Sequence, residues 1–292
     1  MKALCTGSDG FVGQYLKKEL EKQGKEVLGF DVKSGHNLLD YEDIRLFLDK
    51  YRPSEIYHLA GQAHVAESFN NPQRTFLINT IGSINLLEAV RNLGIVTKIM
   101  LCGTSEEYGT AEPKENGHLE PKSPYAISKI AMDYMGQLYS KAYGLHVVTT
   151  RAFNHTQAGR GEMYAESSWA KQIAEIEKGK REYLEHGNLE SVRNYNDARD
   201  IVRAYTLVIN LEPGVYNICS DQNLKMSEIL EELTSMAKVK ISTQCNQSLL
   251  RPADFSFKKP SCEKFKKLTG WEPKYPIHET LRDLLKDWRK RV

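Results

Sequence analysis

Tyr125 and Lys129 are the side chains whose types and spacing best suit proton transfer. They belong to the run SPYAISK, and a separation of four residues places both on one face of a helix, one turn apart. A neighbouring ammonium group stabilises a phenolate and so lowers the pKa of a tyrosine toward neutrality. The pair predicts a general acid and base at Tyr125, tuned by Lys129. Of the fifteen tyrosines, only this one has lysine at the fourth following position.

A second polar group, Thr104-Ser105-Glu106, follows an apolar run at 99–102 that is typical of a buried strand. Open α/β sheets bind their ligands at the carboxyl ends of the strands. We therefore expect the two hydroxyls and the carboxylate of this triplet to lie at the ligand-binding edge of a sheet.

A glycine-rich turn lies near the amino terminus. The run TGSDGFVG carries Gly7, Gly10 and Gly13, follows an apolar run at 2–6 and leads into a helix-forming segment. Glycines allow a tight turn, a close approach of backbone to a pyrophosphate and close packing of helix on strand. The start of the helix offers N–H groups to the phosphates. This strand–turn–helix context predicts a dinucleotide site.

Asp31 ends the next expected strand, 31 − 13 = 18 residues after Gly13. An acidic residue at that offset accepts hydrogen bonds from the ribose hydroxyls and repels a 2′-phosphate. The position favours NAD over NADP, and hence NADH over NADPH. Lys33 is close enough to weaken that preference.

Composition excludes several classes of protein. The 40 basic and 38 acidic residues give a net charge of +2, which predicts neither a nucleic-acid partner nor a membrane partner. No run approaches about eighteen apolar residues, so we expect no membrane span. The histidines and five cysteines lack ligand spacing, and no metal site is predicted. The cysteine usage and the lack of a signal peptide favour the reducing cytoplasm.

Strands and helices alternate through the first half of the chain. Strands are expected at 2–6, 25–31, 55–59, 98–103 and 146–151, and helices at 13–24, 40–51, 73–93 and 123–143. This order predicts an α/β fold with a Rossmann-type, doubly wound parallel sheet. We expect a dinucleotide-binding domain at 1–152, to which elements of the carboxyl-terminal half return, and a nucleotide-sugar lobe at 153–292.

The second half has a less regular pattern. Helices are expected at 167–178, 197–211, 226–237 and 277–291, with one strand at 215–219 and loops at 153–155, 187–193 and 250–252. We interpret it as a smaller lobe that covers the nicotinamide end of the cofactor. The loop regions of this half carry Arg193 and Arg251, and Arg151 lies just before the half begins. Because arginine grips a diphosphate through two hydrogen bonds, these arginines could bind the diphosphate of a nucleotide sugar.

Five runs taken in order, TGSDGFVG, HLAG, TSEEYG, SPYAISK and RAFNH, resemble the extended short-chain dehydrogenase/reductase family, which acts on nucleotide sugars. The resemblance covers essentially the whole chain. The runs AKQIAEIEKG, HGNLESVRNYNDARDIVRAY, LLRPADF and TGWEPKYPIHETLRDLL are similar to the GDP-mannose branch, which contains 4,6-dehydratases and 4-keto-6-deoxy-mannose reductases. The short length and the carboxyl-terminal run are more similar to the reductases.

The resemblance implies a set of cofactor residues. Its dinucleotide site would comprise Gly7, Gly10, Phe11, Val12, Gly13, Asp31, Asn37, Leu38, Leu59, Ala60, Gly61, Tyr125 and Lys129. Asn37 and Leu38 would lie near the adenine, and the segment from Leu59 to Gly61 would line the path of the dinucleotide.

The resemblance also implies a catalytic set and a substrate set. The catalytic residues would be Thr104, Tyr125 and Lys129, joined by Glu106 if a C5 proton is removed. The nucleotide sugar would be held by Glu106, Asn154, Lys171, Arg193, Arg251 and Asp254.

Three positions depart from the family pattern or blur it. Asp31 stands where these GDP-sugar enzymes often accommodate NADP, and Asn194 stands where an aspartate is common. Glu106 matches the triplet of the dehydratases, although reductases can carry a glutamate there too.

The sequence therefore predicts an oxidoreductase that reduces the C4 ketone of GDP-4-keto-6-deoxy-mannose to a GDP-D-rhamnose-type product. A GDP-mannose 4,6-dehydratase, and a C4 epimerase or dehydrogenase with tightly bound NAD, remain open as alternatives. A dinucleotide-binding regulator without turnover is disfavoured by the intact catalytic set. We expect a cytoplasmic homodimer whose substrate is a nucleotide sugar.

Overall fold

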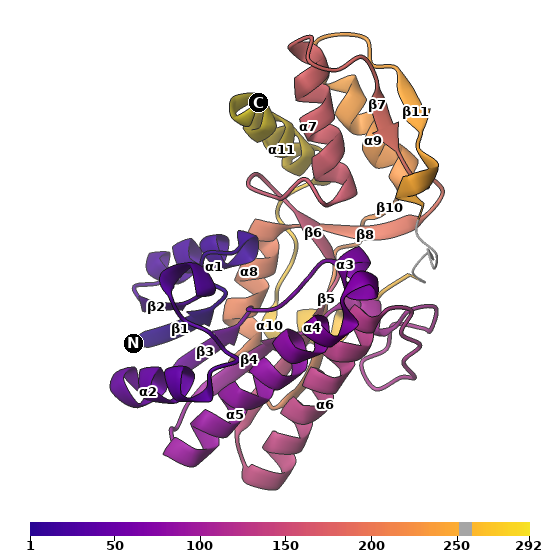
Figure 1. Cartoon of the computed structure of the whole chain (residues 1–292). Coiled ribbons are helices and arrows are strands. Elements are labelled where there is room, and N and C mark those ends of the chain that lie inside the picture. The colour runs from indigo at the N-terminus through magenta and orange to yellow at the C-terminus, as the bar shows by residue number, and fades with distance from the viewer. Residues whose placement is uncertain (251–258) are drawn as a thin grey trace. The chain divides into compact units, whose positions relative to one another are not determined.

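The computed structural model describes residues 1–250 and 259–292. The chain forms two compact units, each built from several segments (Figure 1). The first unit contains Met1–Ala152, Ile201–Ile218 and Ser261–Trp271, and the second contains Phe153–Asp200, Cys219–Pro260 and Glu272–Val292. Among the described residues, no helix is long and apolar enough to cross a membrane.

The first unit is built on one six-stranded sheet with the order β2-β1-β3-β4-β5-β9, in which every neighbouring pair is parallel. Its strands are β1 (Lys2–Thr6), β2 (Glu26–Phe30), β3 (Glu55–His58), β4 (Lys98–Cys102), β5 (His146–Ala152) and β9 (Gly214–Ile218). The predicted doubly wound sheet is confirmed. The order of the strands reverses between β1 and β3, and sheets of this kind bind ligands at such a switch point.

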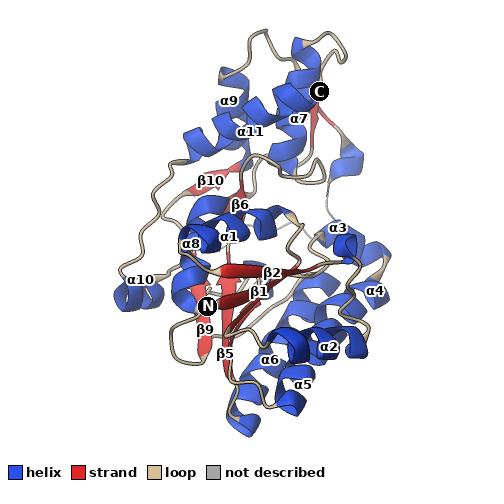
Figure 2. Cartoon of the chain, turned by 90° about the vertical axis from the view of Figure 1, so that its left-hand side faces the viewer, coloured by secondary structure: helices blue, strands red, loops and turns tan. Residues whose placement is uncertain are grey.

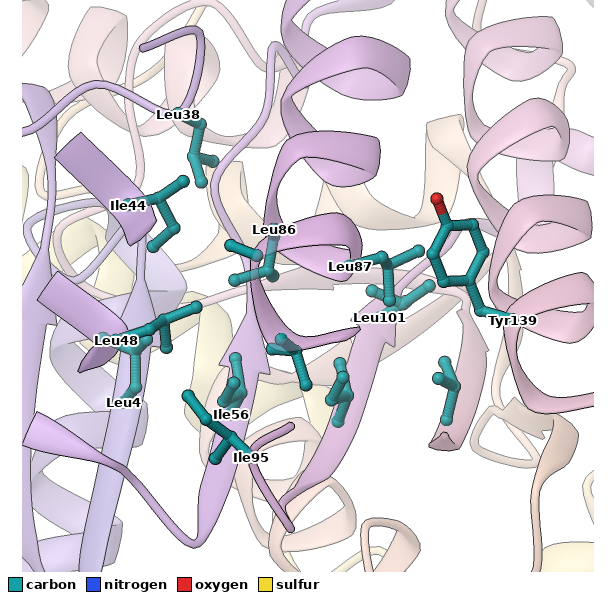
Figure 3. Packing of buried hydrophobic residues seen from close by; sticks show 14 of the residues in the cluster. Leu4, Leu38, Ile44, Leu48, Ile56, Leu86, Leu87, Ile95, Leu101 and Tyr139 are labelled. Carbon is teal, nitrogen blue, oxygen red and sulfur yellow. The ribbon is translucent and has the colours of Figure 1, made fainter. Parts of the chain in front are cut away.

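Helices cover both faces of this sheet (Figure 2). On one face lie α2 (Tyr41–Tyr51), α5 (Gly82–Leu93) and α6 (Pro124–Tyr143). Their apolar sides pack on strand residues such as Leu4, Ile56 and Leu101 in a single core (Figure 3). The other face carries α1 (Phe11–Lys22) and the part of α8 (Ala198–Val208) that belongs to this unit. These two helices are tied by a hydrogen bond from Gln23 Nε2 to Thr206 Oγ1.

The helix expected at 73–93 is divided into three segments. It begins as α4 (Pro72–Phe76), passes through a π-helical segment η2 (Leu77–Ile81) and continues as α5. The predicted stop at Gly94 is confirmed, with φ of +58° at that glycine. The unit also contains α3 (Val65–Asn70), α10 (Glu263–Thr269) and the 3₁₀ segments η1 (Val32–Ser34) and η3 (Ser105–Glu107).

The second unit combines small sheets with three longer helices. A sheet of order β10-β8-β6 contains β6 (Asn154–Thr156), β8 (Val192–Asp197) and β10 (Asn223–Lys225), and β7 (Leu184–His186) pairs with β11 (Thr243–Cys245). The helices are α7 (Ala165–Glu177), α9 (Met226–Ser235) and α11 (Ile277–Arg291). The unit also contains the 3₁₀ turn η4 (Gln247–Leu249). They enclose a core around Trp169, Leu233 and Trp288.

Two of the predicted loops were partly wrong. Asn154 and His155 belong to β6, and Arg193 belongs to β8. The helix expected from Asp197 begins one residue later, because Asp197 ends β8. β6 has three residues, too few to display the alternation by which a strand is recognised in a sequence, and the six residues of β8 are mostly polar.

Candidate active site

The glycine-rich turn leaves no room for side chains at two positions. Gly7 has φ of +72°, and a Cβ there would lie 2.8 Å from the backbone nitrogen of Ala60. A Cβ on Gly13 would lie 2.2 Å from the carbonyl oxygen of Gly7. Gly10 is the N-cap of α1 and supplies no side-chain acceptor to the first amides of that helix. A bare turn of this kind before a helix fits the pyrophosphate of a dinucleotide. Phe11 and Val12 form the first turn of that helix.

Asp31 follows β2 and binds the same turn. Its Oδ2 accepts a hydrogen bond from the backbone N–H of Asp9 at 3.1 Å, and its Oδ1 accepts from the N–H of Lys33 at 2.9 Å. The ammonium of Lys33 donates to the carbonyl oxygen of Asp9 at 3.3 Å. A carboxylate and an ammonium therefore lie beside the glycine-rich turn, where one favours ribose hydroxyls and the other favours a phosphate.

Asn37 and Leu38 lie on the connection after η1. The backbone N–H of Asn37 donates to Asp43 Oδ2 at 2.8 Å. Leu38 is buried in the core against α5, and its carbonyl oxygen accepts from Asn85 Nδ2 at 2.8 Å. Their contact with an adenine stays a prediction.

The segment Leu59, Ala60 and Gly61 follows β3 and connects the glycine-rich turn to Lys129. Ala60 N–H donates to Thr6 Oγ1 at 3.2 Å. A Cβ on Gly61 would lie 3.0 Å from Asn79 Oδ1 and 3.4 Å from Lys129 Nζ. A larger residue at position 61 would therefore press on Asn79 and Lys129, beside the expected path of the cofactor.

The predicted start of the tyrosine–lysine helix is confirmed. Ser123 caps α6 by accepting from the N–H of Ala126 at 3.1 Å, and proline follows at the first helical position. Tyr125 and Lys129 are 8% and 5% exposed. Lys129 Nζ donates to the carbonyl oxygen of Cys102 at 2.8 Å, which fixes the ammonium at the carboxyl end of β4. Burial lowers the pKa of Lys129.

Thr104 caps η3 at the same end of β4. Its Oγ1 accepts from the N–H of Glu106 at 3.3 Å, and its own N–H donates to Glu107 Oε1 at 2.8 Å. These two bonds form a capping box. Ser105 and Glu107 are buried, whereas Glu106 is half-buried. Glu106 is therefore the more accessible of the two adjacent carboxylates.

Glu107 was missed by the sequence reasoning, although the Thr-x-x-Glu spacing of a capping box was present. Burial, followed by the charge of Asp133, raises the pKa of its carboxyl, and the charge of Arg151 opposes that rise. Its Oε2 accepts from Arg151 Nε at 2.8 Å. Arg151 also donates to Asp133 Oδ2 at 2.6 Å. The idea that Arg151 grips a diphosphate is therefore wrong, since its guanidinium is occupied by these two buried carboxylates.

Asn79 is a further residue that the sequence reasoning missed. It lies in the π-helical segment η2, and such segments are frequent at functional sites. Its side chain accepts from Gln62 N at 2.8 Å and donates to the carbonyl oxygen of Gln62 at 3.0 Å. It also donates to Ser128 Oγ at 2.9 Å, next to Lys129. An isolated asparagine in a helical pattern gives no signal that its side chain will bond to the segment after β3 and to α6.

The expected sugar-binding residues of the second unit lie on three elements. Asn154 is in β6, and its carbonyl oxygen accepts from Asn196 Nδ2 at 3.0 Å. Arg193 is buried in β8, where its Nη1 donates to the carbonyl oxygen of Val192 at 3.0 Å. Lys171 on α7 pairs with Glu162, whose hydrogen bond is the main cause of a raised pKa of the lysine. Arg251 and Asp254 lie outside the described residues.

The asparagine at position 194 has a structural reason. Its Nδ2 donates to the carbonyl oxygens of Ser220 and Gln222 at 2.8 and 3.1 Å, and its Oδ1 accepts from the N–H of Ser220 at 3.2 Å. An ionised aspartate could not donate to those carbonyls. The amide therefore holds β8 to the segment before β10.

Within residues 1–250 and 259–292, no three His, Cys, Asp or Glu side chains are grouped as metal ligands.

A parallel sheet with a glycine-rich turn after its first strand, and a Tyr-x-x-x-Lys pair on the helix after its fourth, define an enzyme of the extended short-chain dehydrogenase/reductase class. Comparison with known proteins gives the branch. The family model described as GDP-mannose 4,6 dehydratase matches residues 34–284. The chain belongs to this family of NAD(P)-dependent enzymes that act on nucleotide sugars.

Two curated relatives represent the two activities of the branch. The chain is 32% identical to the GDP-6-deoxy-D-mannose reductase of Pseudomonas aeruginosa over 299 residues, which cover 100% of this chain and 98% of that protein. It is 30% identical to GDP-mannose 4,6 dehydratase 1 of Arabidopsis thaliana over 315 residues, which cover 96% of this chain and 87% of that protein.

Solved structures give the same fold. RMD from Pseudomonas aeruginosa, complexed with NADPH, superposes with a TM-score of 0.91 at 30% identity and covers 100% of this chain and 99% of its own. The UDP-glucose 4-epimerase of Thermus thermophilus, complexed with NAD, has a TM-score of 0.89 at 28% identity and covers both chains fully. The predicted fold and family are confirmed.

Proposed function

We propose that this enzyme reduces the C4 ketone of GDP-4-keto-6-deoxy-mannose and yields a GDP-D-rhamnose-type product. The observation that carries the proposal is the match with the Pseudomonas reductase, which spans essentially the whole of both chains. The plant dehydratase extends further beyond its matched region. Lys129, anchored at the end of β4 beside Gly61, supports a proton-transfer site on the cofactor path.

The first unit would hold the dinucleotide. Its glycine-rich turn fits the pyrophosphate, and the Asp31 carboxylate fits the ribose hydroxyls. On the strength of Asp31 we assign NADH as the preferred cofactor, with Lys33 as the feature that favours NADPH. The Pseudomonas relative was solved with NADPH, so the measurement that tests this assignment compares the two reduced cofactors directly.

The chemistry of the chain's own residues follows from acid catalysis. When bound, the nicotinamide supplies a hydride to C4 of the sugar. The phenol of Tyr125 donates its proton to the oxygen at C4 as negative charge develops there. Lys129 stabilises the phenolate that remains, and the hydroxyl of Thr104 donates a hydrogen bond to the same oxygen.

The second unit would hold the nucleotide sugar. We assign Asn154, Lys171 and Arg193 to it, together with Arg251 and Asp254 beyond the described residues. Arg193 and Arg251 are the members of this set suited to a diphosphate, because guanidinium groups bind phosphate oxygens in pairs.

A GDP-mannose 4,6-dehydratase is the second candidate, and Glu106 favours it. This carboxylate is half-buried beside Thr104, whereas the neighbouring Glu107 is occupied by Arg151. A dehydratase needs a base for the C5 proton of the sugar, and Glu106 is the one carboxylate of the triplet. A reductase needs no such base.

One experiment separates the two candidates. The wild-type enzyme is incubated with GDP-mannose and NAD, and separately with the 4-keto-6-deoxy sugar and NADH or NADPH. A reductase consumes only the keto sugar, and Glu106→Gln keeps turnover within roughly tenfold because only positioning is disturbed. The matched control is Glu112→Gln, which changes an exposed carboxylate on the following loop. Release of the keto sugar from GDP-mannose, abolished by Glu106→Gln, would replace the reductase with the dehydratase.

A further inference from the structure

Arg151 is a buried cation with a protein partner on each side of its guanidinium. It lies on β5 and is 2% exposed. Its Nε donates to Glu107 Oε2 at 2.8 Å, and its Nη2 donates to Asp133 Oδ2 at 2.6 Å. Its Nη1 donates to the carbonyl oxygen of Glu115 at 3.2 Å. The guanidinium also lies over the ring of Tyr108, 5.0 Å from its centroid.

Each of the two carboxylates is attached to a different catalytic segment: Glu107 bonds to the segment of Thr104, and Asp133 belongs to α6. The second oxygen of Glu107 accepts from the backbone N–H of Thr104 at 2.8 Å and so fixes the cap of η3. Asp133 lies on α6, four residues beyond Lys129 and on the same buried side of the helix. Its second oxygen accepts from Gln137 Nε2 at 3.0 Å. One cation therefore connects the threonine segment to the tyrosine–lysine helix.

We propose that Arg151 is a positioning residue for the reaction. Through Glu107 and Asp133 it sets the Thr104 hydroxyl relative to the tyrosine and lysine of α6. It makes no contact with the reacting atoms, and the inference rests on the proposed function, in which those three side chains act on one oxygen.

The geometry requires a guanidinium. A planar fork presents N–H groups in fixed directions and can bridge two carboxylates and a carbonyl at once, whereas an ammonium is a point charge. The pair of buried carboxylates also depends on it, because the positive charge opposes the rise in the pKa of Glu107 that burial and Asp133 cause. Removing Arg151 would leave both carboxylates without the guanidinium that bridges them, so the sharper test changes one carboxylate instead.

A purely structural role is the competing explanation, and the same unit offers a matched control. Lys25 Nζ and Glu55 Oε2 form a second ion pair at 2.6 Å with little exposed surface on either side chain. Glu55 begins β3, so this pair lies at the amino end of the strands, away from Thr104 and α6. Glu55→Gln removes one buried charge from the same sheet without touching the catalytic segments.

The test measures kcat and KM for reduction of the keto sugar by Glu107→Gln and Glu55→Gln, each in the wild-type and Thr104→Val backgrounds. A glutamine keeps the acceptor for the Thr104 N–H but cannot form the ion pair. Misplacement of about 1 Å costs on the order of 100-fold in rate, so we expect Glu107→Gln to lower kcat roughly 10- to 100-fold with KM nearly unchanged. Glu55→Gln should lower the melting temperature but keep kcat within about twofold of the wild-type value, since Glu55 lies far from the reacting groups.

The double variant decides the mechanism. If Glu107 acts through the threonine hydroxyl, its substitution should cost no further activity once Thr104 is valine. The inference would be overturned if the losses in kcat from Glu107→Gln and Thr104→Val were fully additive. It would also be overturned if Glu107→Gln lowered kcat no more than Glu55→Gln does. Asp133→Asn provides a second test that changes no residue of η3, with deuterium exchange of the Thr104 amide as its readout. Exchange should accelerate in Glu107→Gln and in Asp133→Asn but not in Glu55→Gln. A wild-type enzyme that leaves the keto sugar unchanged defeats the proposed function itself, and this inference with it.

Discussion

Tyr125 carries the proton in the proposed reduction, and its removal tests the site directly. Tyr125→Phe keeps the ring and the helix but removes the phenol. General acid catalysis contributes about 10²–10⁴-fold, so turnover should fall by that order while KM changes little. The measurement is the rate of NADH or NADPH consumption with the keto sugar. Tyr134→Phe, an exposed tyrosine on the same helix, is the control, and equal rates for both variants would remove Tyr125 from the mechanism.

The proposed preference for NADH rests on Asp31. Asp31→Ala removes the acceptor for the ribose and the repulsion of a 2′-phosphate. The ratio of kcat/KM for NADH to that for NADPH should fall more than tenfold, which corresponds to about 1.4 kcal/mol. Using the ratio cancels any general loss from the broken bonds to Asp9 and Lys33. A wild-type enzyme that already prefers NADPH would contradict the assignment.

The residues that could be found from the sequence are those whose signals are local. Tyr125 and Lys129 are one helical turn apart, and the spacing of the glycines to Asp31 is set by one strand–helix–strand unit. The ion cluster of Arg151 could not be found in this way, because its carboxylates lie 44 and 18 positions away. Only the topology of the sheet brings them together. The same sequence reasoning therefore counted Arg151, with Arg193 and Arg251, among the arginines that could grip a diphosphate.

A chain of buried hydrogen bonds connects four secondary-structure elements. Thr6 at the end of β1 bonds to His58 Nδ1, and His58 Nε2 bonds to Ser83 Oγ on α5, both at 2.8 Å. Ser83 donates to the carbonyl oxygen of Asn79 in η2 at 2.6 Å, so its oxygen must accept from an N–H on Nε2. Ala60 N–H donates to Thr6, whose own proton is then free for Nδ1. The network thus specifies a neutral imidazole protonated at Nε2.

This network predicts a dependence of stability on pH. Burial, together with the charge of Lys129, lowers the pKa of His58 to about 3 from its usual 6.5. Between these values the unfolded chain binds a proton that the folded chain does not, so the free energy of unfolding falls as the pH falls. The slope from this group is at most about 1.4 kcal/mol per pH unit.

The measurement is the urea midpoint at several pH values between the two pKa values of His58. His58→Gln keeps a donor for Ser83 but does not titrate, so its midpoint should fall less steeply with acidification than that of the wild type. His118→Gln changes an exposed histidine and should follow the wild type. Parallel curves for wild type and His58→Gln would show that the histidine is not held neutral.

The longer elements of the first unit followed from the sequence because their apolar periodicity and caps are strong. Asp40 accepts from the amides of Glu42 and Asp43, as the expected cap at that position requires. The π-helical segment η2 could not be predicted, because its residues are as apolar and helix-forming as those around it. Its geometry depends on the bonds that Asn79 makes with Gln62 and Ser128.

At the scale of the whole molecule, one apolar surface supports the expected homodimer. Ile127, Tyr134 and Leu138 on α6 are 45%, 58% and 50% exposed, and their spacing of seven and four residues places them on one stripe. Leu77 and Ile81 are exposed on the adjacent η2. Contiguous exposed apolar side chains of this kind mark interaction sites.

We expect the wild type to be a dimer and the double variant Ile127→Glu with Leu138→Glu to be a monomer. Size-exclusion chromatography with light scattering measures the mass of each. Val96→Glu replaces an apolar side chain that is 97% exposed on a loop and should leave the mass unchanged. A monomeric wild type at all concentrations would contradict the expectation, and so would dimers of unchanged stability in the double variant.

The strand order of the first unit also has a consequence for synthesis on the ribosome. β5 pairs with β4 on one side and with β9 on the other, and β9 is translated more than sixty positions after Ala152, once β8 and α8 have been made. Until Ile218 leaves the exit tunnel, β5 presents an unpaired edge of amides and carbonyls, the kind of edge that recruits strands from other chains. Nascent chains that end shortly after Ala152 should therefore bind chaperones or aggregate, and release from them should coincide with the emergence of β9.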